Sequence, residues 1–585
     1  MIKILFKHLK WKQWLMIAVC AGLIAAMVWL DLKLPEYMST ITRLVETDGS
    51  KMSDVWINGG YMLACALGSA GLSVIVGFFV SRISSGLARD LRSDVFNRVQ
   101  DFSKNEIKRF STASLITRST NDVMQIQRFV AMGLQILIKS PILAVWAIIK
   151  ISNKGWQWSL TTAIAVVAIL AVMITVLMIA LPKFKKMQTL TDNVNRVTRE
   201  NLTGLRVIRA YNAEGYQEEK FEKSNDELTK TSLFANRAMI TMSPFISLIM
   251  SGLSLAIYWI GASIINTSGD FAKLTVFSDM VVFISYAMQV VLAFMLMAMI
   301  FIMLPRASVS AKRINELLDT TPSIVDGTGE VSTDLKGEVE FKNVSFKYPD
   351  ADEYVLHNIS FTAHQGETVA FIGSTGSGKS TLIDLIPRFY DATDGAVLID
   401  GVDVKDYKLN DLHNKLGYVS QKAFLFSGTV QSNITFGDDI DGKATEEEVK
   451  RAAKIAQAKD FVEKMPEAYN SEITQGGTNV SGGQKQRLSI ARAIARNPEI
   501  FIFDDSFSAL DYKTDKKLRK ALDKELTSST RLIVAQRIGT IKTADKIIVL
   551  DEGEMVGMGT HDELMKNCKV YQEIALSQLS KEELA

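Results

Sequence analysis

The sequence predicts an α-helical membrane domain of six spans with long cytoplasmic helical extensions, followed by a soluble α/β domain. Nearly all long apolar runs of the 585 residues lie before Pro305. After Gly337, short apolar strands alternate with helical stretches, which is the pattern of a mostly parallel sheet. We expect the membrane domain at residues 1–310, a linker at 311–336 and the α/β domain at 337–585.

Composition excludes some classes of protein. A net charge of +2 argues against nucleic-acid binding driven by overall charge. The three cysteines have no metal-ligand spacing. The first apolar run is too long for the core of a cleaved signal peptide, so we expect it to remain as a membrane anchor.

Six segments are long and apolar enough to cross a hydrocarbon core of about 30 Å. The expected spans are Trp14–Leu32, Trp56–Val80, Val130–Ile151, Trp158–Leu181, Phe245–Ile265 and Val281–Leu304. These spans are largely uncharged, and the sixth is rich in methionine, which suits adaptable apolar surfaces.

The connecting loops predict the orientation. Residues 82–129 contain nine Lys and Arg and residues 182–240 contain eleven, whereas the loops on the opposite side hold five. Basic loops stay cytoplasmic, so both chain ends and the α/β domain are predicted inside. The two basic loops are polar and nearly free of proline. In the first, Leu87, Leu91 and Val95 recur at helical spacing, so we expect the membrane helices to continue into the cytoplasm and return through short helices.

The stretch "ETVAFIGSTGSGKSTLIDLI" reads as a strand at Thr368–Ile372, a glycine-rich loop and a helix. Gly373–Ser380 matches the phosphate-loop (P-loop) pattern G-x-x-x-x-G-K-[ST]. Glycines let backbone N–H groups approach phosphate oxygens, Lys379 brings a charge to the β- and γ-phosphates, and the Ser380 hydroxyl suits Mg²⁺. ATP and Mg²⁺ are therefore the expected ligands. The candidate residues of this loop are Gly373, Ser374, Thr375, Gly376, Ser377, Gly378, Lys379, Ser380 and Thr381.

A second apolar strand, "EIFIFD", ends in Asp504. In P-loop folds such a strand lies beside the phosphate loop, so Asp504 is predicted to hold Mg²⁺ through its water shell.

The order of further motifs narrows the family. "YVSQ" with Gln421 follows the P-loop, "VSGGQKQRLS" (Val480–Ser489) precedes the Mg²⁺-side strand, and "SALD" (Ser508–Asp511) follows it. Along essentially its whole length the chain resembles the ATP-binding cassette (ABC) family. Six spans followed by one cassette resemble a half-size exporter.

The resemblance implies roles for several residues. Tyr348 in "VSFKYP" would stack on adenine, Gln421 would contact Mg²⁺, and Glu472 would centre a cross-talk segment. The signature residues Ser481, Gly482, Gly483 and Gln484 would face the ATP of a partner cassette, and Asp511 would belong to the D-loop. The two cytoplasmic connections would carry coupling helices that dock on the cassettes.

Two catalytic positions depart from the family pattern. After Asp504 the family has a Glu that polarises the attacking water, whereas this chain has Asp505, whose carboxylate reaches roughly 1.5 Å less far. A misplacement of about 1 Å costs on the order of a hundredfold in rate. The family also has a His where this chain has Gln536, and an amide lacks the charge and tautomers of an imidazole. We expect this site to bind ATP–Mg²⁺ and to cleave it poorly.

The signature remains intact, so this chain would complete the ATP site of a partner chain, whose other residues the partner supplies. The pattern resembles the degenerate-site subunit of a bacterial heterodimeric multidrug exporter. We therefore expect a heterodimer with a homologous half-transporter that carries the catalytic Glu and the switch His; a slow homodimer is the alternative assembly.

The expected function is ATP-driven efflux of lipophilic or amphipathic compounds from the cell membrane, with the cassette cytoplasmic. The expected contacts are membrane lipid, small lipophilic substrates and the partner chain, but no nucleic acid. The alternatives are a lipid or peptide exporter, or a nucleotide-gated channel or regulator. Against a channel, the expected spans hold no ring of charged residues.

Overall fold

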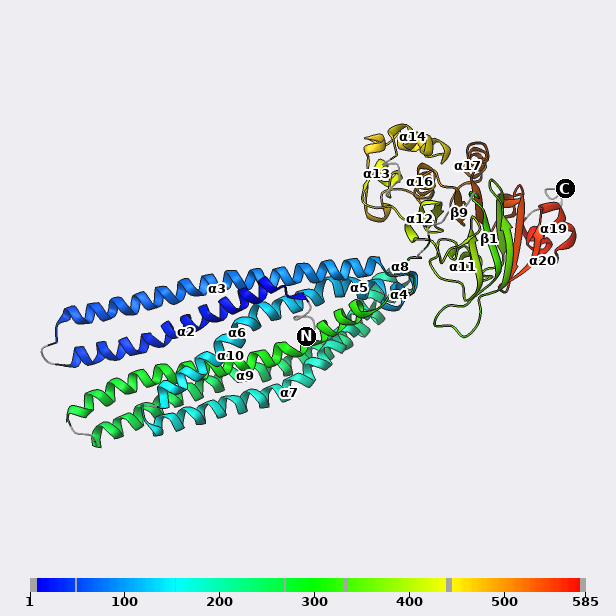
Figure 1. The fold of residues 1–585 in the computed structure, drawn as a ribbon. Coiled ribbons are helices and arrows are strands. Elements are labelled where there is room, and N and C mark those ends of the chain that lie inside the picture. The colour runs from blue at the N-terminus through cyan, green and yellow to red at the C-terminus, as the bar shows by residue number, and fades with distance from the viewer. Residues whose placement is uncertain are drawn as a thin grey trace. The chain divides into compact units, whose positions relative to one another are not determined.

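The computed structural model describes residues 8–47, 50–152, 154–267, 270–327, 329, 335–437 and 444–578. The chain forms two compact units (Figure 1), which are described one at a time below. The membrane unit comprises Met1–Arg98 and Ala113–Thr320, and the nucleotide unit comprises Val99–Thr112 and Thr321–Ala585. The boundaries expected from the sequence, at 310 and 337, stay predictions.

Six long helices build the membrane unit, and each contains a stretch apolar enough to cross a membrane. They are α2 (Trp11–Glu46), α3 (Met52–Gln100), α6 (Val123–Ser152), α7 (Trp156–Thr203), α9 (Glu214–Thr267) and α10 (Asp270–Asp319). At 1.5 Å per residue, a helix of about 50 residues is about 75 Å long, more than twice the hydrocarbon core. The predicted helical extensions are therefore confirmed.

Within this unit the helices run alongside one another, α7 packing along α9 and α10 along α6, while α2 contacts both α6 and α10 (Figure 1). Five of the six helices contain one internal proline and remain helical on both sides of it. These prolines are Pro35, Pro141, Pro182, Pro244 and Pro305.

The spans carry more charge than the sequence reading suggested. Lys139 lies near the middle of the expected span 130–151, and its Nζ is 3.4 Å from Asp31 Oδ2 of α2. The Ser69 hydroxyl of α3 donates to the other Asp31 oxygen at 2.5 Å. Because the charges pair with each other, they do not form the ring that would mark an ion path.

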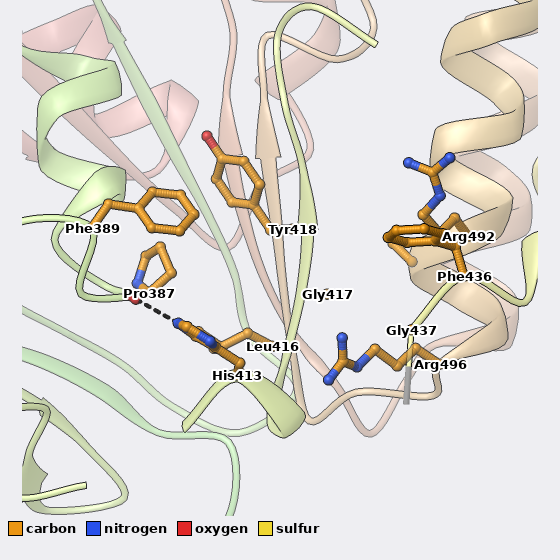
Figure 2. Close-up of a pocket in the computed structure, with 11 residues that line it drawn as sticks. Pro387, Phe389, His413, Leu416, Gly417, Tyr418, Phe436, Gly437, Arg492 and Arg496 are labelled. Carbon is orange, nitrogen blue, oxygen red and sulfur yellow. Dashed lines mark hydrogen bonds between the residues drawn. The ribbon is translucent and has the colours of Figure 1, made fainter. Parts of the chain in front are cut away.

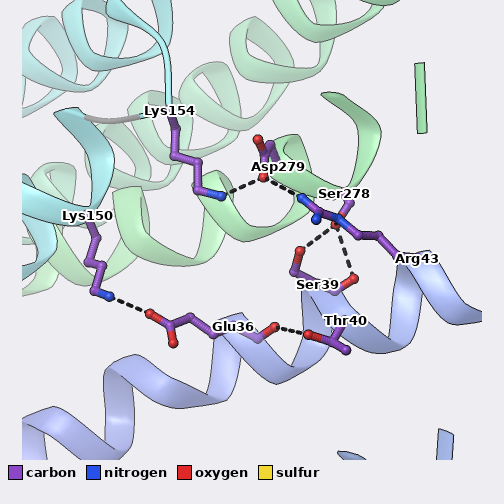
Figure 3. Close-up of polar contacts among 8 residues, drawn as sticks. All are labelled: Glu36, Ser39, Thr40, Arg43, Lys150, Lys154, Ser278 and Asp279. Carbon is purple, nitrogen blue, oxygen red and sulfur yellow. Dashed lines mark hydrogen bonds and ion pairs between the residues drawn. The ribbon is translucent and has the colours of Figure 1, made fainter. Parts of the chain in front are cut away.

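A second polar network joins α2, α6 and α10 near the ends of these helices (Figure 3). Lys150 Nζ lies 2.5 Å from Glu36 Oε1, and the Ser39 and Ser278 hydroxyls are 2.5 Å apart. Asp279 is shared by Lys154 at 2.5 Å and Arg43 at 3.4 Å. These contacts hold the three helices together where their apolar stretches end.

Short helices occur in both cytoplasmic connections, as predicted. The first connection contains α4 (Lys104–Phe110), α5 (Thr112–Thr117) and the π-helical turn η1 (Arg118–Asp122), and the second contains α8 (Leu205–Ala210). Ser103 caps α4, since its hydroxyl accepts a hydrogen bond from Asn105 N and Glu106 reaches back to the Ser103 N–H.

The nucleotide unit is built on a six-stranded sheet with the order β12-β11-β3-β10-β9-β6. Five strands of this sheet are parallel: β3 (Thr368–Gly373), β6 (Leu416–Val419), β9 (Ile500–Asp504), β10 (Thr530–Val534) and β11 (Lys546–Asp551). The sixth strand, β12 (Glu554–Gly559), pairs antiparallel with β11 at the edge of the sheet. Successive side chains of β3 enter opposite cores. Ala370 and Ile372 belong to one hydrophobic cluster, and Val369 and Phe371 to the other. Covered on both faces, the strand reads as the continuous apolar run seen in the sequence.

An antiparallel sheet of order β2-β1-β4-β5 and a short β7–β8 pair complete the strands. Their bounds are β1 (Val339–Phe346), β2 (Leu356–Ala363), β4 (Asp394–Ile399), β5 (Val402–Asp403), β7 (Gly428–Thr429) and β8 (Glu472–Ile473). Glu472 thus lies on β8. The helices are α11 (Lys379–Asp384), α12 (Leu409–Asn414), α13 (Val430–Ile434), α14 (Glu446–Ile455), α15 (Lys459–Val462), α16 (Gly482–Ala495), α17 (Tyr512–Glu525), α18 (Ile538–Ile541), α19 (His561–Asn567) and α20 (Lys569–Gln578), with 3₁₀ turns η2 (Ala468–Asn470) and η3 (Gln475–Gly477).

Candidate functional site

The glycine-rich loop lies between β3 and α11. A Cβ on Gly373 would stand 2.0 Å from the Leu550 carbonyl oxygen, so only glycine fits there. Gly378 has φ +91, a left-handed conformation that glycine adopts without a side-chain clash. These two positions turn the chain sharply from the strand into the helix, and loops of this kind bring backbone N–H groups close to phosphate oxygens.

The Lys379 side chain folds back over this loop. Its Nζ donates to Gly373 O at 2.9 Å, Ser374 O at 2.6 Å and Ser377 Oγ at 3.1 Å. Burial lowers the pKa of Lys379, while the nearby carboxylates Asp505 and Asp504 oppose that shift. The ammonium is thus held by neutral acceptors, which the charged oxygens of a phosphate can replace favourably.

Asp504 ends β9, and β10 lies between this strand and β3. One strand thus separates the strand that ends in Asp504 from the P-loop strand. The carboxylate nevertheless reaches the loop, because Ser380 Oγ donates to Asp504 Oδ1 at 3.0 Å. Burial raises the pKa of Asp504, and the Ser380 hydrogen bond counteracts part of this rise.

A hydroxyl beside a carboxylate provides the hard oxygen ligands that Mg²⁺ prefers. Within the described part of the chain no group of three or more His, Cys, Asp or Glu gathers as a metal site. The donor set formed by Ser380, Asp504 and Gln421 therefore fits a Mg²⁺ that arrives with a nucleotide and keeps much of its water.

Asp505 is buried and has φ +44, and its backbone N–H donates to Val534 O at 3.0 Å. One of its carboxylate oxygens, Oδ2, accepts from Gln536 Nε2 at 2.9 Å and from Gln421 Nε2 at 3.3 Å. Burial raises the pKa of Asp505, and the Gln421 hydrogen bond lowers it in part. The two residues that depart from the family pattern are therefore bonded to each other.

A cavity of about 520 Å³ opens over the loop. All of the predicted P-loop residues except Ser377 line it, together with Gln421 and Gln536; Ser377 is buried against Lys379 instead. Sequence reasoning missed four other lining residues, Val355 on the β1–β2 connection and Ile574, Ser577 and Gln578 on α20. No motif marks them, since a helix far along the chain supplies three of the four.

Tyr348 does not line this cavity. Its hydroxyl lies 2.9 Å from Thr381 Oγ1, and its ring packs edge-on against Phe346 and Tyr390. The Lys108 ammonium of α4 lies 5.3 Å from the centre of the Tyr348 ring. The structure thus brings Tyr348 to the P-loop helix, and stacking on adenine stays a prediction.

The signature residues lie at the start of α16. The Ser481 hydroxyl accepts from Gln484 N at 3.3 Å, while Gln484 Oε1 accepts from Ser481 N at 2.9 Å, a reciprocal capping box. A Cβ on Gly483 would be 3.3 Å from Ala509 O, so Gly483 lets the helix start close to the "SALD" turn, whereas a Cβ on Gly482 would meet no atom within 4 Å. Asp511 ends that turn by accepting from Thr514 N at 3.0 Å. None of these residues lines the P-loop cavity.

The first connection contacts the far end of the P-loop helix. Lys104 Nζ of α4 donates to Asp384 Oδ2 of α11 at 2.7 Å and lies 5.0 Å from the Phe389 ring centre. A change at the P-loop can therefore reach α4 through one six-residue helix.

A second cavity of about 340 Å³ shares no lining residue with the first. Figure 2 shows its aromatic walls, Phe389, Tyr418 and Phe436, with Arg492 beside them. Arg492 donates to Asn433 O at 2.8 Å, and burial lowers its pKa to about 10. This cavity offers apolar rings with a fixed cation at its edge.

Family models match both units. The ABC transporter transmembrane region matches residues 15–294, and the ABC transporter model matches residues 356–508. An uncharacterized ABC transporter ATP-binding protein of Mycobacterium tuberculosis (strain ATCC 25618 / H37Rv) is 39% identical over 93% of each chain. The chain belongs to the ABC transporter family.

Other relatives support an exporter. The uncharacterized ABC transporter ATP-binding protein YfiB of Bacillus subtilis is 34% identical over 97% of each chain. The ATP-dependent lipid A-core flippase of Pseudomonas aeruginosa is 33% identical over 85% of this chain and 81% of its own length. The solved structure of a bacterial Atm1-family ABC exporter with ATP bound is 25% identical, covers 96% of each chain and gives a TM-score of 0.75.

The protein is therefore an ABC exporter half, a multi-pass membrane protein with a cytoplasmic nucleotide-binding domain. It is an ATPase-coupled transporter, and its ABC domain implies ATP binding at the P-loop cavity. The fold class, the enzyme class and the membrane location predicted from the sequence are confirmed.

Proposed function

We propose that this ABC exporter half works with a related, non-identical chain, and that its own site holds ATP–Mg²⁺ with little turnover. One observation carries the proposal. Asp505 occupies the position of the family's catalytic Glu, and Gln536 and Gln421 both donate to the same oxygen of its carboxylate. A general base must reach a proton of the attacking water, and this carboxylate is both shorter and engaged within the chain.

The binding residues remain complete. Lys379 would exchange its three neutral acceptors for phosphate oxygens, and Ser380, Asp504 and Gln421 would hold Mg²⁺. When bound, Mg²⁺ neutralises phosphate charge. Gln536 donates a neutral hydrogen bond toward the terminal phosphate but transfers no proton. The site retains nucleotide without the groups that position and deprotonate water.

The signature then serves the partner. Ser481–Gln484 begin α16, a 14-residue helix whose first N–H groups suit an anion. Since these residues do not line this chain's own cavity, we propose that they cover the ATP held by the partner's P-loop. The partner supplies the Glu and the His, so hydrolysis takes place mainly there.

Nucleotide-driven closure of the two cassettes reaches the spans through the short helices of the cytoplasmic connections. The α4 contact with α11 is one such path. The aromatic cavity of Figure 2 suits an apolar side chain from a partner's connection, such as that following α8, where Tyr211 is exposed. Closure switches the substrate cavity from inward- to outward-facing, and hydrolysis resets it.

For cargo, apolar and methionine-bearing spans favour lipophilic or amphipathic compounds, that is, multidrug efflux. Lipid export is the second candidate, because the chain is 33% identical to a lipid A-core flippase. Inverted membrane vesicles that hold the complex distinguish these cargoes. Vanadate-sensitive accumulation of a lipophilic dye supports efflux, whereas ATP-dependent transfer of a labelled lipid without dye accumulation supports the second candidate. Nucleotide-gated ion current without either would refute pumping.

Pairing is tested by affinity purification of the tagged chain from its native host. We expect a related ABC half with Glu after its Mg²⁺-side Asp and His at its switch position. A self-paired assembly that consumes ATP rapidly and moves cargo would overturn the proposed function.

A further inference from the structure

The last described helix, α20, contributes to the nucleotide cavity although it lies beyond the part of the chain that the ABC family model matches, residues 356–508. Ile574, Ser577 and Gln578 face this cavity together with the P-loop. Tyr571 and Ala575, on the same helix, are fully buried, and the Tyr571 hydroxyl lies 2.7 Å from His561 Nδ1. The helix is therefore anchored by its apolar face, independently of the residues that reach the site.

Gln578 bonds the segment that carries the switch residue. Its Nε2 donates to the Gln536 carbonyl oxygen at 2.7 Å, and its Oε1 accepts from the Ile538 N–H at 2.9 Å. Both ends of one amide thus hold the backbone on the two sides of Arg537. The same segment directs the Gln536 side chain to Asp505 at 2.9 Å.

The two ends of this segment are fixed, since the Ala535 N–H donates to Phe371 O at 3.2 Å and the Ile538 side chain is fully buried. The segment follows the end of β10 at Val534, and α18 begins only at Ile538. Gln536 and Arg537 are exposed, and Arg537, the N-cap of α18, makes no side-chain capping bond. Between these fixed ends, the two hydrogen bonds from Gln578 restrain the backbone on both sides of the exposed Arg537.

We propose that Gln578 is a positioning residue, whose amide fixes the 536–538 backbone so that Gln536 is presented to the terminal phosphate of bound ATP. The inference rests on the proposed function, in which Gln536 faces that phosphate. Gln578 itself acts through the switch segment. Its loss should weaken nucleotides that carry a γ-phosphate and spare those that lack one.

The test uses the full-length chain in detergent. Displacement of a fluorescent ATP analogue measures binding of the uncleavable β,γ-imido ATP analogue and of ADP, each with Mg²⁺. We expect Gln578→Ala to weaken the imido analogue about fivefold, the scale of one or two lost neutral hydrogen bonds, and to change ADP less than about twofold. Gln578→Glu keeps the acceptor for Ile538 N–H but turns a carboxylate toward the Gln536 carbonyl, so its loss should be at least as large.

Gln572→Ala is the matched control. Gln572 lies on the same helix, and its amide donates to Met565 O at 2.9 Å and Lys566 O at 3.3 Å, away from the cavity. This variant should bind both nucleotides normally. The proposal is overturned if Gln578→Ala leaves the imido-to-ADP ratio unchanged, if Gln572→Ala shifts it equally, or if Gln578→Ala unfolds the unit. Because the imido analogue is not cleaved, brisk hydrolysis at this site would refute the proposed function without altering this ratio.

Discussion

Asp505 and Gln536 bond each other at 2.9 Å, and both stand where the family has a longer or more basic side chain. A shortened carboxylate leaves room that a water could fill, but here two amides take up its Oδ2 oxygen. Gln421, which is expected to contact Mg²⁺, thus also bonds the carboxylate that stands in the position of the family's water-activating Glu.

We predict that Asp505→Asn lowers the ATPase rate of the assembled complex less than about twofold. In the proposed function this site contributes little turnover, and asparagine keeps an oxygen that can accept from Gln536. Phosphate release from the purified complex measures this. Lys379→Ala in the same background is the contrasting variant, since it removes the phosphate-binding charge. If Asp505→Asn were the crippling change, the roles of the two sites would be reversed.

At this scale the P-loop residues found in the sequence line the cavity, Ser377 excepted, because the motif is local; their binding of phosphate stays a prediction. The sequence could not place Tyr348, whose hydroxyl lies at Thr381, or reveal Gln578. Both positions depend on packing between segments far apart in the chain, and such packing produces no periodic pattern in the sequence.

At the scale of single elements, helix α16 holds the signature residues at its N-terminus. Its capping box orders the first turn, so Ser481 has a structural duty as well as the proposed one across the dimer. An N-cap serine replaced by alanine costs about 1 kcal/mol.

The two duties separate in mutants. We predict that Ser481→Ala lowers the melting temperature by a few degrees and reduces ATPase partly, whereas Ser481→Arg nearly abolishes ATPase by blocking the partner's γ-phosphate. Thermal unfolding and phosphate release are measured on the same complex. Thr445→Ala, which removes the equivalent cap of α14 on the same unit, should reproduce only the thermal effect. Full activity in Ser481→Arg would contradict the proposed composite site.

In the membrane unit, Asp31 on α2 and Lys139 on α6 form an ion pair in apolar surroundings. We predict that Lys139→Met destabilises the chain by on the order of 2 kcal/mol, since it leaves a carboxylate within the span without its cation. Asp31→Asn combined with Lys139→Met should recover most of the loss, as a double-mutant cycle in detergent would measure. Additive losses would show that the two charges are not coupled.

The membrane helices were predictable from the length of their apolar runs, and the strands at Thr368–Ile372 and Glu499–Asp504 from short apolar runs. The sequence predicted that helices such as α3 and α9 continue into the cytoplasm, but not where they end. It did not predict the order of the strands in the sheet. Parallel strands are joined by long crossovers, so the interposition of β10 between β3 and β9 is set by the packing of the whole sheet.

For the whole molecule, the first cytoplasmic connection is the notable junction, since α4 clusters with the nucleotide unit although α3 and α6 on either side of it belong mainly to the membrane unit. In its Lys104–Asp384 contact the lysine is exposed but the carboxylate is buried, so removal of the lysine leaves a buried charge without its partner. We expect this contact to transmit movement of the P-loop helix α11 to α4.

We therefore predict that Lys104→Met lowers the melting temperature by a few degrees and also lowers substrate transported per ATP several-fold. Transport and phosphate release in the same proteoliposomes give this ratio. Lys450→Met, which breaks a surface pair with Glu446 on α14, should alter neither. Exchange of the charges, Lys104→Asp with Asp384→Lys, should restore part of the coupling, and an unchanged ratio in Lys104→Met would refute the idea.

The internal prolines of five long helices add a mechanical consequence. Each proline removes one backbone hydrogen bond of its helix and crowds the carbonyl four residues earlier. We therefore expect each of these helices to bend most easily at its proline. Among the six long helices, α3 is the one without an internal proline. Bending stress applied at one end of these helices should thus concentrate at five known positions, where spectroscopic spin labels placed on either side would record the flexing directly.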